Sequence, residues 1–151
     1  MSKKEEGMSP TLQAQFADYA TFHATPGNKA CHYVAVPLIV LTLIALLAQV
    51  ELVTIAGFTV TLAEVVIVLA TAYYLTLDVA LALLMLAASV LSAWAGRFIP
   101  PMVALGLFAA AWVLQFIGHY VYEHRSPAFF RNLTHLLVGP LWVLAKATGR
   151  A

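Results

Sequence analysis

The chain has 151 residues, of which 62% are hydrophobic and 10% are charged, and its formal net charge is +1. Soluble domains are about 45–50% apolar and about 25% charged, so this composition excludes an ordinary soluble protein and indicates an integral membrane protein. The small net charge, without a basic stripe carrying interleaved aromatic residues, argues against nucleic acid as a partner.

The first segments predict a polar tail followed by a helix on the membrane surface. Residues 1–9 are expected to be disordered, and no apolar signal-peptide core follows them directly. From Pro10 to Phe22, apolar side chains recur at helical spacing, and Ser9 suits the cap that precedes a first-turn proline. We therefore expect an amphipathic helix at the bilayer surface, at the start of a single membrane-embedded domain over residues 10–151.

Apolar segments then predict an all-α polytopic bundle with about four transmembrane helices. The expected spans are, in chain order, about 33–50, 60–75, 79–95 and 102–122. Each approaches the roughly 20 apolar residues that a crossing needs. Residues 51–59 are expected to form a short turn. Segment 127–147 is interrupted by polar residues and by Gly139 and Pro140, so it is expected to form an interfacial or re-entrant helix.

The cations are unevenly distributed about these spans. Those flanking the first and last spans are Lys3, Lys4, Lys29, Arg125 and Arg131. Arg97 alone lies in the connector between the third and fourth spans, so the positive-inside rule assigns the two flanks to the cytoplasm. That face would belong to the inner membrane of a bacterium or the endoplasmic reticulum of a eukaryote. Four crossings also bring His32 and His119 to the same membrane face.

Two groups of polar residues border the spans at that face. His23 and His32 lie just before the first span, and His119 and Glu123 lie at the end of the last one. Histidine and carboxylate are costly at membrane depth and usually mark ion, proton or metal chemistry. Together they suit zinc or non-haem iron, so the sequence predicts a divalent-metal site. Glu123 is either a ligand or an acceptor that orients an imidazole.

Further polar residues are expected to support this site. Those expected to orient the ligands lie one helical turn from a predicted ligand and are Tyr19, Asn28 and Gln115. His135, one turn beyond Arg131, is a further candidate ligand. Arg125 and Arg131 either follow the positive-inside bias or bind the carboxylate of a substrate.

Several enzyme classes are excluded. Five histidines without an adjacent pair are too few for the clustered histidine boxes of two-iron membrane desaturases and hydroxylases. The sequence has no Gly-rich phosphate loop and no Gly-x-Ser-x-Gly elbow. Two alternatives to a metal enzyme stay open at this point. One is a haem or electron-transfer protein with two axial histidines, and the other is a transporter or scaffold without chemistry.

Two stretches resemble the signatures of a known membrane enzyme family. Residues 19–32 read YATFHATPGNKACH and include the first two histidines. Residues 115–132 read QFIGHYVYEHRSPAFFRN and include Gln115, His119 and Asn132. Together with the spacing between them, these stretches resemble the membrane 2-hydroxy fatty acid dioxygenases over nearly the whole chain.

The resemblance implies a catalytic domain with Fe(2+) as cofactor and a 2-hydroxy fatty acid and O2 as substrates. The implied reaction is alpha-oxidation, which releases CO2 and the fatty acid that is one carbon shorter. The implied catalytic residues are His23, His32, His119 and Glu123. The lipid bilayer is the implied environment. The acyl length, the hydroxyl stereochemistry, the choice of iron over zinc and the formation of homo-oligomers are left open.

Overall fold

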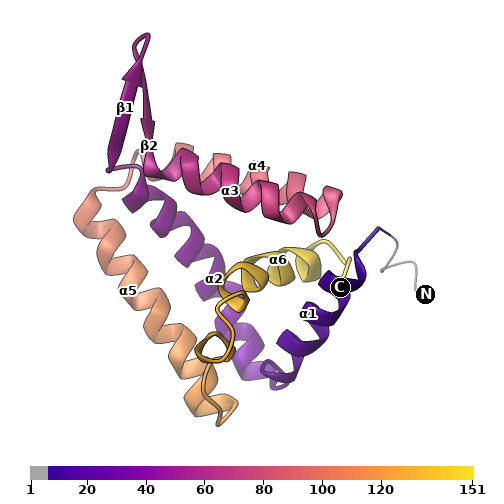
Figure 1. Cartoon of the computed structure of the whole chain (residues 1–151). Helices are drawn as coiled ribbons and strands as arrows, with labels where there is room; N and C mark the ends of the chain where they lie inside the picture. The colour runs from indigo at the N-terminus through magenta and orange to yellow at the C-terminus, as the bar shows by residue number, and fades with distance from the viewer. Residues whose placement is uncertain (1–6) are drawn as a thin grey trace.

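The computed structural model describes residues 7–151 and is built mostly from helices (Figure 1). The first elements are α1 (Pro10–Thr21), α2 (Pro26–Leu47), β1 (Glu51–Ile55) and β2 (Phe58–Thr61). They are followed by α3 (Leu62–Leu75), α4 (Val79–Gly96) and α5 (Pro101–Ile117). The last elements are the π-helical turn η1 (Gly118–Tyr122), the 3-10 turn η2 (Ala128–Phe130) and α6 (His135–Ala147). The expected all-α class is confirmed.

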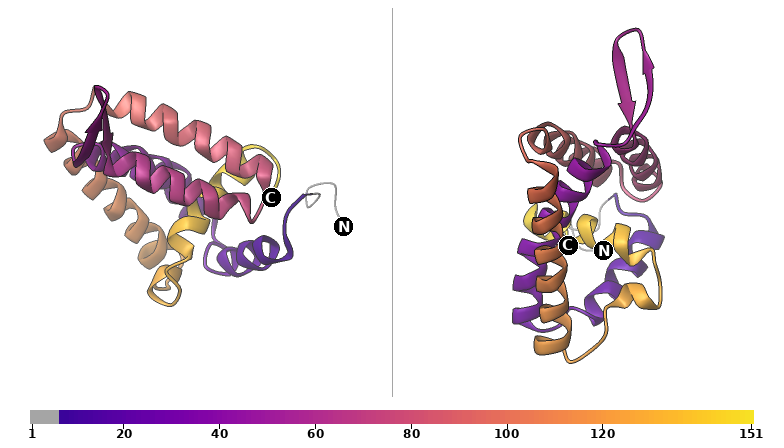
Figure 2. Two further views of the ribbon diagram at one scale, coloured as in Figure 1. Left: turned by 45° about the horizontal axis from the view of Figure 1, so that its top comes forward. Right: turned by 90° about the vertical axis from the view of Figure 1, so that its left-hand side faces the viewer.

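Three helices within residues 7–151 are long and apolar enough to cross a membrane. They are α2, α4, and α5 with its continuation to Tyr122. The expected second span, α3, has 14 residues. At 1.5 Å per residue it is about 21 Å long, shorter than the roughly 30 Å hydrocarbon core. Three of the four predicted spans are therefore helices of spanning length, and the fourth, α3, is a shorter apolar helix that packs beside α4 (Figure 2).

The expected turn at residues 51–59 is instead a β-hairpin that projects away from the helices (Figure 1). β1 and β2 pair antiparallel, with Ile55 opposite Phe58. The two residues between them, Ala56 and Gly57, have φ angles of 51° and 83°. This left-handed backbone matches the twist that a two-residue hairpin needs. The strands are rich in Val, Thr, Ile and Phe, which favour extended backbone.

Helix α1 is amphipathic as expected, and its apolar face packs on protein. Leu12 and Phe16 share a buried core with Val138 and Leu141 of α6. Residues 1–6 of the expected disordered tail lie outside the described residues. The remainder of that tail is ordered at Met8, which is 8% exposed and belongs to the same core. Core packing therefore begins before the helix does.

Helices α2 and α5 run side by side in opposite directions, so the start of α2 lies beside the end of α5 (Figures 1 and 2). Gly118 permits this close approach. A Cβ atom added there would lie 2.5 Å from Asn28 Oδ1 and 3.0 Å from Cys31 Cβ. Gly27 on α2 is similarly covered by the ring of Tyr122. The two glycines bring the residues at this end of the bundle into contact.

Replacing Gly118 with alanine is expected to destabilise the fold by about 1–3 kcal/mol, because the methyl group displaces Asn28 or separates the helices. Gly106 on the same helix is the matched control, since no described atom lies within 4 Å of its added Cβ. Gly106→Ala is expected to be neutral or stabilising by up to about 1 kcal/mol. Thermal unfolding in detergent compares the two variants, and equal midpoints would contradict the close-packing role of Gly118.

Candidate metal centre

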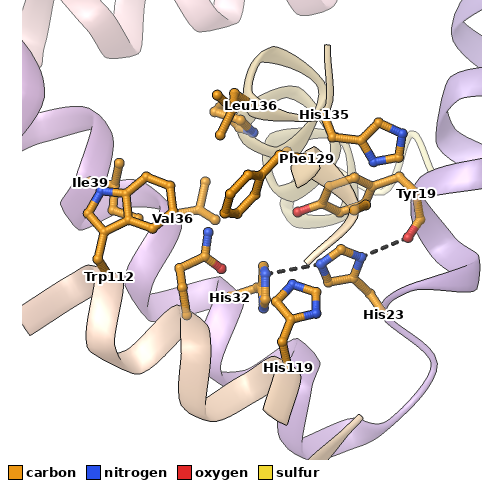
Figure 3. Close-up of a pocket in the computed structure, with 14 residues that line it drawn as sticks. Tyr19, His23, His32, Val36, Ile39, Trp112, His119, Phe129, His135 and Leu136 are labelled. Carbon is orange, nitrogen blue, oxygen red and sulfur yellow. Dashed lines mark hydrogen bonds between the residues drawn. The ribbon is translucent and has the colours of Figure 1, made fainter. Parts of the chain in front are cut away.

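Three imidazoles from separate segments meet where α2 begins and α5 ends (Figure 3). His23 lies in the connection between α1 and α2, His32 lies on α2, and His119 lies in η1. Their exposed fractions are 1%, 1% and 3%. One ring nitrogen of each lies within 4.8 Å of the others, and His23 Nε2 and His32 Nε2 are 3.0 Å apart. The structure therefore brings together the three histidines that the sequence singled out.

Backbone carbonyl groups orient two of these rings. His23 Nδ1 donates to Tyr19 O at 2.7 Å, and His32 Nδ1 donates to Asn28 O at 2.9 Å. A carbonyl can only accept, so both protons sit on Nδ1 when the rings are neutral, and both Nε2 lone pairs face the centre. Proteins fix metal-binding histidines in this way. The Tyr19 ring also stacks on His23, with centroids 3.9 Å apart.

The two Nε2 atoms present an unfavourable arrangement in the absence of a cation. Burial, followed by the neighbouring His32 ring, lowers the pKa of His23 to about 3, so this imidazole is neutral at physiological pH. Two neutral rings then direct their lone pairs at each other across 3.0 Å. A divalent cation between them would convert this repulsion into coordination. The donor set therefore fits a metal ion.

His119 completes the group from η1, the turn that continues α5. Its ring centroid lies 4.9 Å from those of His23 and His32. Its Nδ1 is buried and has no hydrogen-bond partner among the described residues. Buried polar atoms are nearly always paired, so this orphan nitrogen is a second indication that a ligand completes the centre.

Glu123 is held by other partners and lies outside the three-nitrogen group. Its carboxylate accepts from Ala24 N at 2.9 Å, Thr25 N at 3.0 Å, Thr25 Oγ1 at 2.8 Å and Asn28 Nδ2 at 3.1 Å. Burial raises the pKa of Glu123, but these donors outweigh it and lower the pKa to about 2. The ionised carboxylate fastens the loop that carries His23 to the end of η1. This geometry favours the orienting role over that of a ligand.

The π-helical turn explains why His119 and Glu123 diverge. Glu123 N donates to Gly118 O, a bond that spans five residues instead of four. In a regular α-helix, residues four apart share a face. The wider turn rotates Glu123 away from His119, toward the loop at Thr25. Such π turns occur frequently at functional sites.

The remaining predicted site residues make other contacts. His135 Nε2 pairs with Asp18 Oδ2 at 2.8 Å, so His135 lies in the pocket wall but outside the three-nitrogen group. Asn132 Oδ1 accepts from Thr134 N at 3.0 Å and from Thr134 Oγ1 at 2.7 Å, just before α6. The first contact ties α6 to α1, and the second is local to the start of α6.

The two arginines gather over one aromatic ring. The guanidinium carbon of Arg125 lies 4.5 Å from the centroid of Phe22, and that of Arg131 lies 5.8 Å away. Arg125 Nη1 also donates to Thr21 O at 3.0 Å. Both side chains are exposed. They therefore surround the loop before His23 from the outside.

Replacing His135 with phenylalanine is expected to leave the metal content unchanged, because the three-nitrogen group does not include His135. The loss of the bond to Asp18 is expected to cost about 0.5–1.5 kcal/mol of stability. Metal analysis of purified His135→Phe protein checks this. A loss of metal while the fold is retained would make His135 a ligand.

The histidines lie at one end of a cavity of about 50 Å³. Gln115 also lines it, and its buried Oε1 has no partner among the described residues. The apolar lining includes Ile39, Trp112, Phe129 and Leu136. These apolar residues could not be predicted from the sequence, because the same residue types face a cavity and face lipid.

Comparison with known proteins agrees with this site. The family described as "2-hydroxy-palmitic acid dioxygenase Mpo1-like" matches residues 9–151. The protein named "2-hydroxy-palmitic acid dioxygenase MPO1" of Saccharomyces cerevisiae is 28% identical over 127 residues, which are 84% of this chain and 73% of that protein. No solved structure matches the chain. The resemblance noted in the sequence is confirmed, and the chain belongs to the Mpo1-like family.

Proposed function

We propose that the protein is an Fe(II)-dependent dioxygenase that shortens 2-hydroxy fatty acids by one carbon. The observation that carries this proposal is the pair of imidazoles whose Nε2 lone pairs face each other at 3.0 Å, beside the buried ring of His119. Three neutral imidazoles suit ferrous iron and leave coordination positions for other ligands. The three histidines are the proposed metal ligands.

Iron is favoured over zinc by the chemistry of the family. The same imidazoles can bind both metals, but zinc has no redox activity. The family and its yeast member are described as dioxygenases, which reduce O2. When bound, iron would supply the redox activity and polarise the hydroxyl and carboxylate of the substrate.

The proposed reaction balances without a further reductant. A 2-hydroxy fatty acid and O2 give the acid that is one carbon shorter, CO2 and water. The bond between C1 and C2 breaks, C1 leaves as CO2, and C2 becomes the new carboxyl carbon. This oxidation removes four electrons, the number that reduction of O2 to water consumes. Neither 2-oxoglutarate nor a reductase is required.

The chain's own residues have distinct proposed roles around the substrate. Gln115 presents an unpaired amide oxygen to the cavity, so we assign it a hydrogen bond to the hydroxyl of the head group. The stacked ring of Tyr19 fixes the plane of His23. Glu123 and Asn28 hold the loop that carries His23. Arg131 is exposed at the rim of an adjoining cavity, where it can attract the carboxylate.

The metal end of the bundle is proposed to face the cytoplasm. Lys29, Arg125 and Arg131 all lie near this end, whereas Arg97 follows α4 at the far end. This asymmetry follows the positive-inside rule. Cysteine labelling from either side of sealed vesicles, at Thr21 and at Phe98, checks the assignment.

Purification without oxygen, followed by metal analysis and an oxygen-electrode trace, tests the proposed function. The expected result is about one iron per chain, and oxygen uptake with 2-hydroxy palmitate that yields CO2 and a 15-carbon acid. Zinc in place of iron, without oxygen uptake, would reject the reaction. A Soret band would instead indicate haem. Haem is disfavoured by the geometry, because axial histidines lie on opposite faces of a macrocycle while these rings are in contact.

A further inference from the structure

The cavity at the metal centre changes from polar to apolar along its length (Figure 3). Tyr19 and the three histidines of the metal centre lie at one end. Ile39 of α2, Trp112 of α5 and Leu136 of α6 lie at the other end. A fatty acid likewise has a polar head group at one end and an apolar tail at the other. The head would therefore meet the histidines while the tail points toward Trp112.

The apolar end adjoins a groove on the outside of the bundle. This second cavity has a volume of about 510 Å³ and shares Trp112, Phe129 and Leu136 with the metal cavity. Phe130 and Leu133 line it further and are 63% and 72% exposed. Exposed apolar side chains of this size face lipid favourably in a chain with membrane-spanning helices. The groove thus lies on the surface between α5 and α6, next to the metal cavity.

We propose that this groove holds the acyl tail of the substrate and admits it sideways from the bilayer. The proposal rests on the proposed function, because it takes a 2-hydroxy fatty acid as the ligand. Its support is the boundary that the two cavities share at Trp112, Phe129 and Leu136, where Leu136 is 44% exposed. Arg131 at the groove rim can hold the carboxylate before the head group reaches the metal.

A competing site lies on the other side of α6. A cavity of about 200 Å³ between α2, α4 and α6 is lined by Val40, Met85 and Ala88, among others. Val36 and Pro140 line both this cavity and the metal cavity. Val36 is only 4% exposed, so it separates this cavity from the metal cavity. Leu136, at the boundary between the metal cavity and the groove, is 44% exposed, so the groove is the more accessible of the two sites.

An open groove and a closed cavity differ in their response to acyl length. Each methylene buried in a closed apolar site raises affinity about fourfold until the cavity is full, and longer chains are then rejected. A tail that emerges into lipid has the same surroundings when bound and when free. The value of kcat/KM is therefore expected to level off with increasing acyl length, without an upper cut-off.

Leu136→Trp tests the groove by narrowing the passage that both cavities share. Its kcat/KM for 2-hydroxy palmitate is expected to fall about tenfold or more, with unchanged iron content and with little loss for 2-hydroxyhexanoate. Leu137→Trp is the matched control, because Leu137 is adjacent, is 39% exposed and lines neither cavity. Equal behaviour of the two variants, or a selective loss in Ala88→Phe instead, would overturn the proposal.

Photolabelling gives a measurement that does not depend on turnover. A 2-hydroxy palmitate carrying a diazirine in its tail is expected to label residues 128–137 and Trp112, and excess unlabelled acid should prevent this. Labelling of residues 85–92 would assign the tail to the cavity between α2, α4 and α6. Labelling spread over the outer face of α4 would show that the tail has no defined binding site. Specific groove labelling without oxygen uptake would retain the tail site and reject the proposed reaction.

Discussion

Replacing His119 with alanine is expected to abolish both iron binding and oxygen uptake. The substitution leaves two of the three proposed ligands at a buried centre. Loss of a group that merely orients a ligand weakens metal binding about 10–100-fold, so loss of the ligand itself should exceed this range. Metal analysis and an oxygen electrode measure the two effects. His23→Ala and His32→Ala are expected to give the same result.

His124→Asn provides the matched control for this substitution. His124 follows His119 by five residues, is exposed, and has a φ of 53°. Asparagine tolerates this left-handed backbone, so the fold should be preserved. Normal iron content and turnover are expected. Iron binding and oxygen uptake at the wild-type level in His119→Ala would remove His119 from the centre and refute the three-histidine site.

Glu123→Gln is expected to weaken both the fold and the metal site. The amide replaces one acceptor oxygen with a donor and places it against the donors of Ala24, Thr25 and Asn28. The expected cost is about 1–3 kcal/mol of stability, because a hydrogen bond to a charged carboxylate is lost. Iron affinity is expected to fall about 10–100-fold, since the loop that carries His23 is no longer held.

The metal-free protein distinguishes this role from direct ligation. If Glu123 fastens the loop, its replacement lowers the unfolding midpoint even without iron. If Glu123 were only an iron ligand, its replacement would leave the unfolding midpoint of the metal-free protein unchanged. Glu64→Gln is the control, because Glu64 also accepts from a threonine, Thr61, but does so at the start of α3, away from the metal end. It is expected to lose about 0.5–2 kcal/mol of capping and no iron affinity.

Local signals predicted much of the fold. Ser9 and Thr25 cap α1 and α2 before a proline, as their order in the sequence indicates. The hairpin was not predicted because Ala56 occupies the position where Asn or Asp usually marks a two-residue turn. The helix α3 begins at Leu62 and not at the predicted residue 60, because hydropathy does not detect the Thr61 cap. In these places local chemistry outweighed the apolar pattern.

The site was predicted less completely than the fold. The meeting of His23, His32 and His119 followed from helix order and chemical type. The geometry of Glu123 could not be predicted, because it depends on a π turn packed against the start of α2 through Gly118. That turn results from tertiary contact, which no periodicity in the sequence reports.

The bond between Ala24 and Glu123 joins positions 99 residues apart. During synthesis, a nascent chain that has not yet inserted α5 therefore offers only two imidazoles and a loose loop. The proposed metal site is therefore complete only after His119 has been synthesised and α5 has inserted. A truncated product that ends before α5 would lack this site.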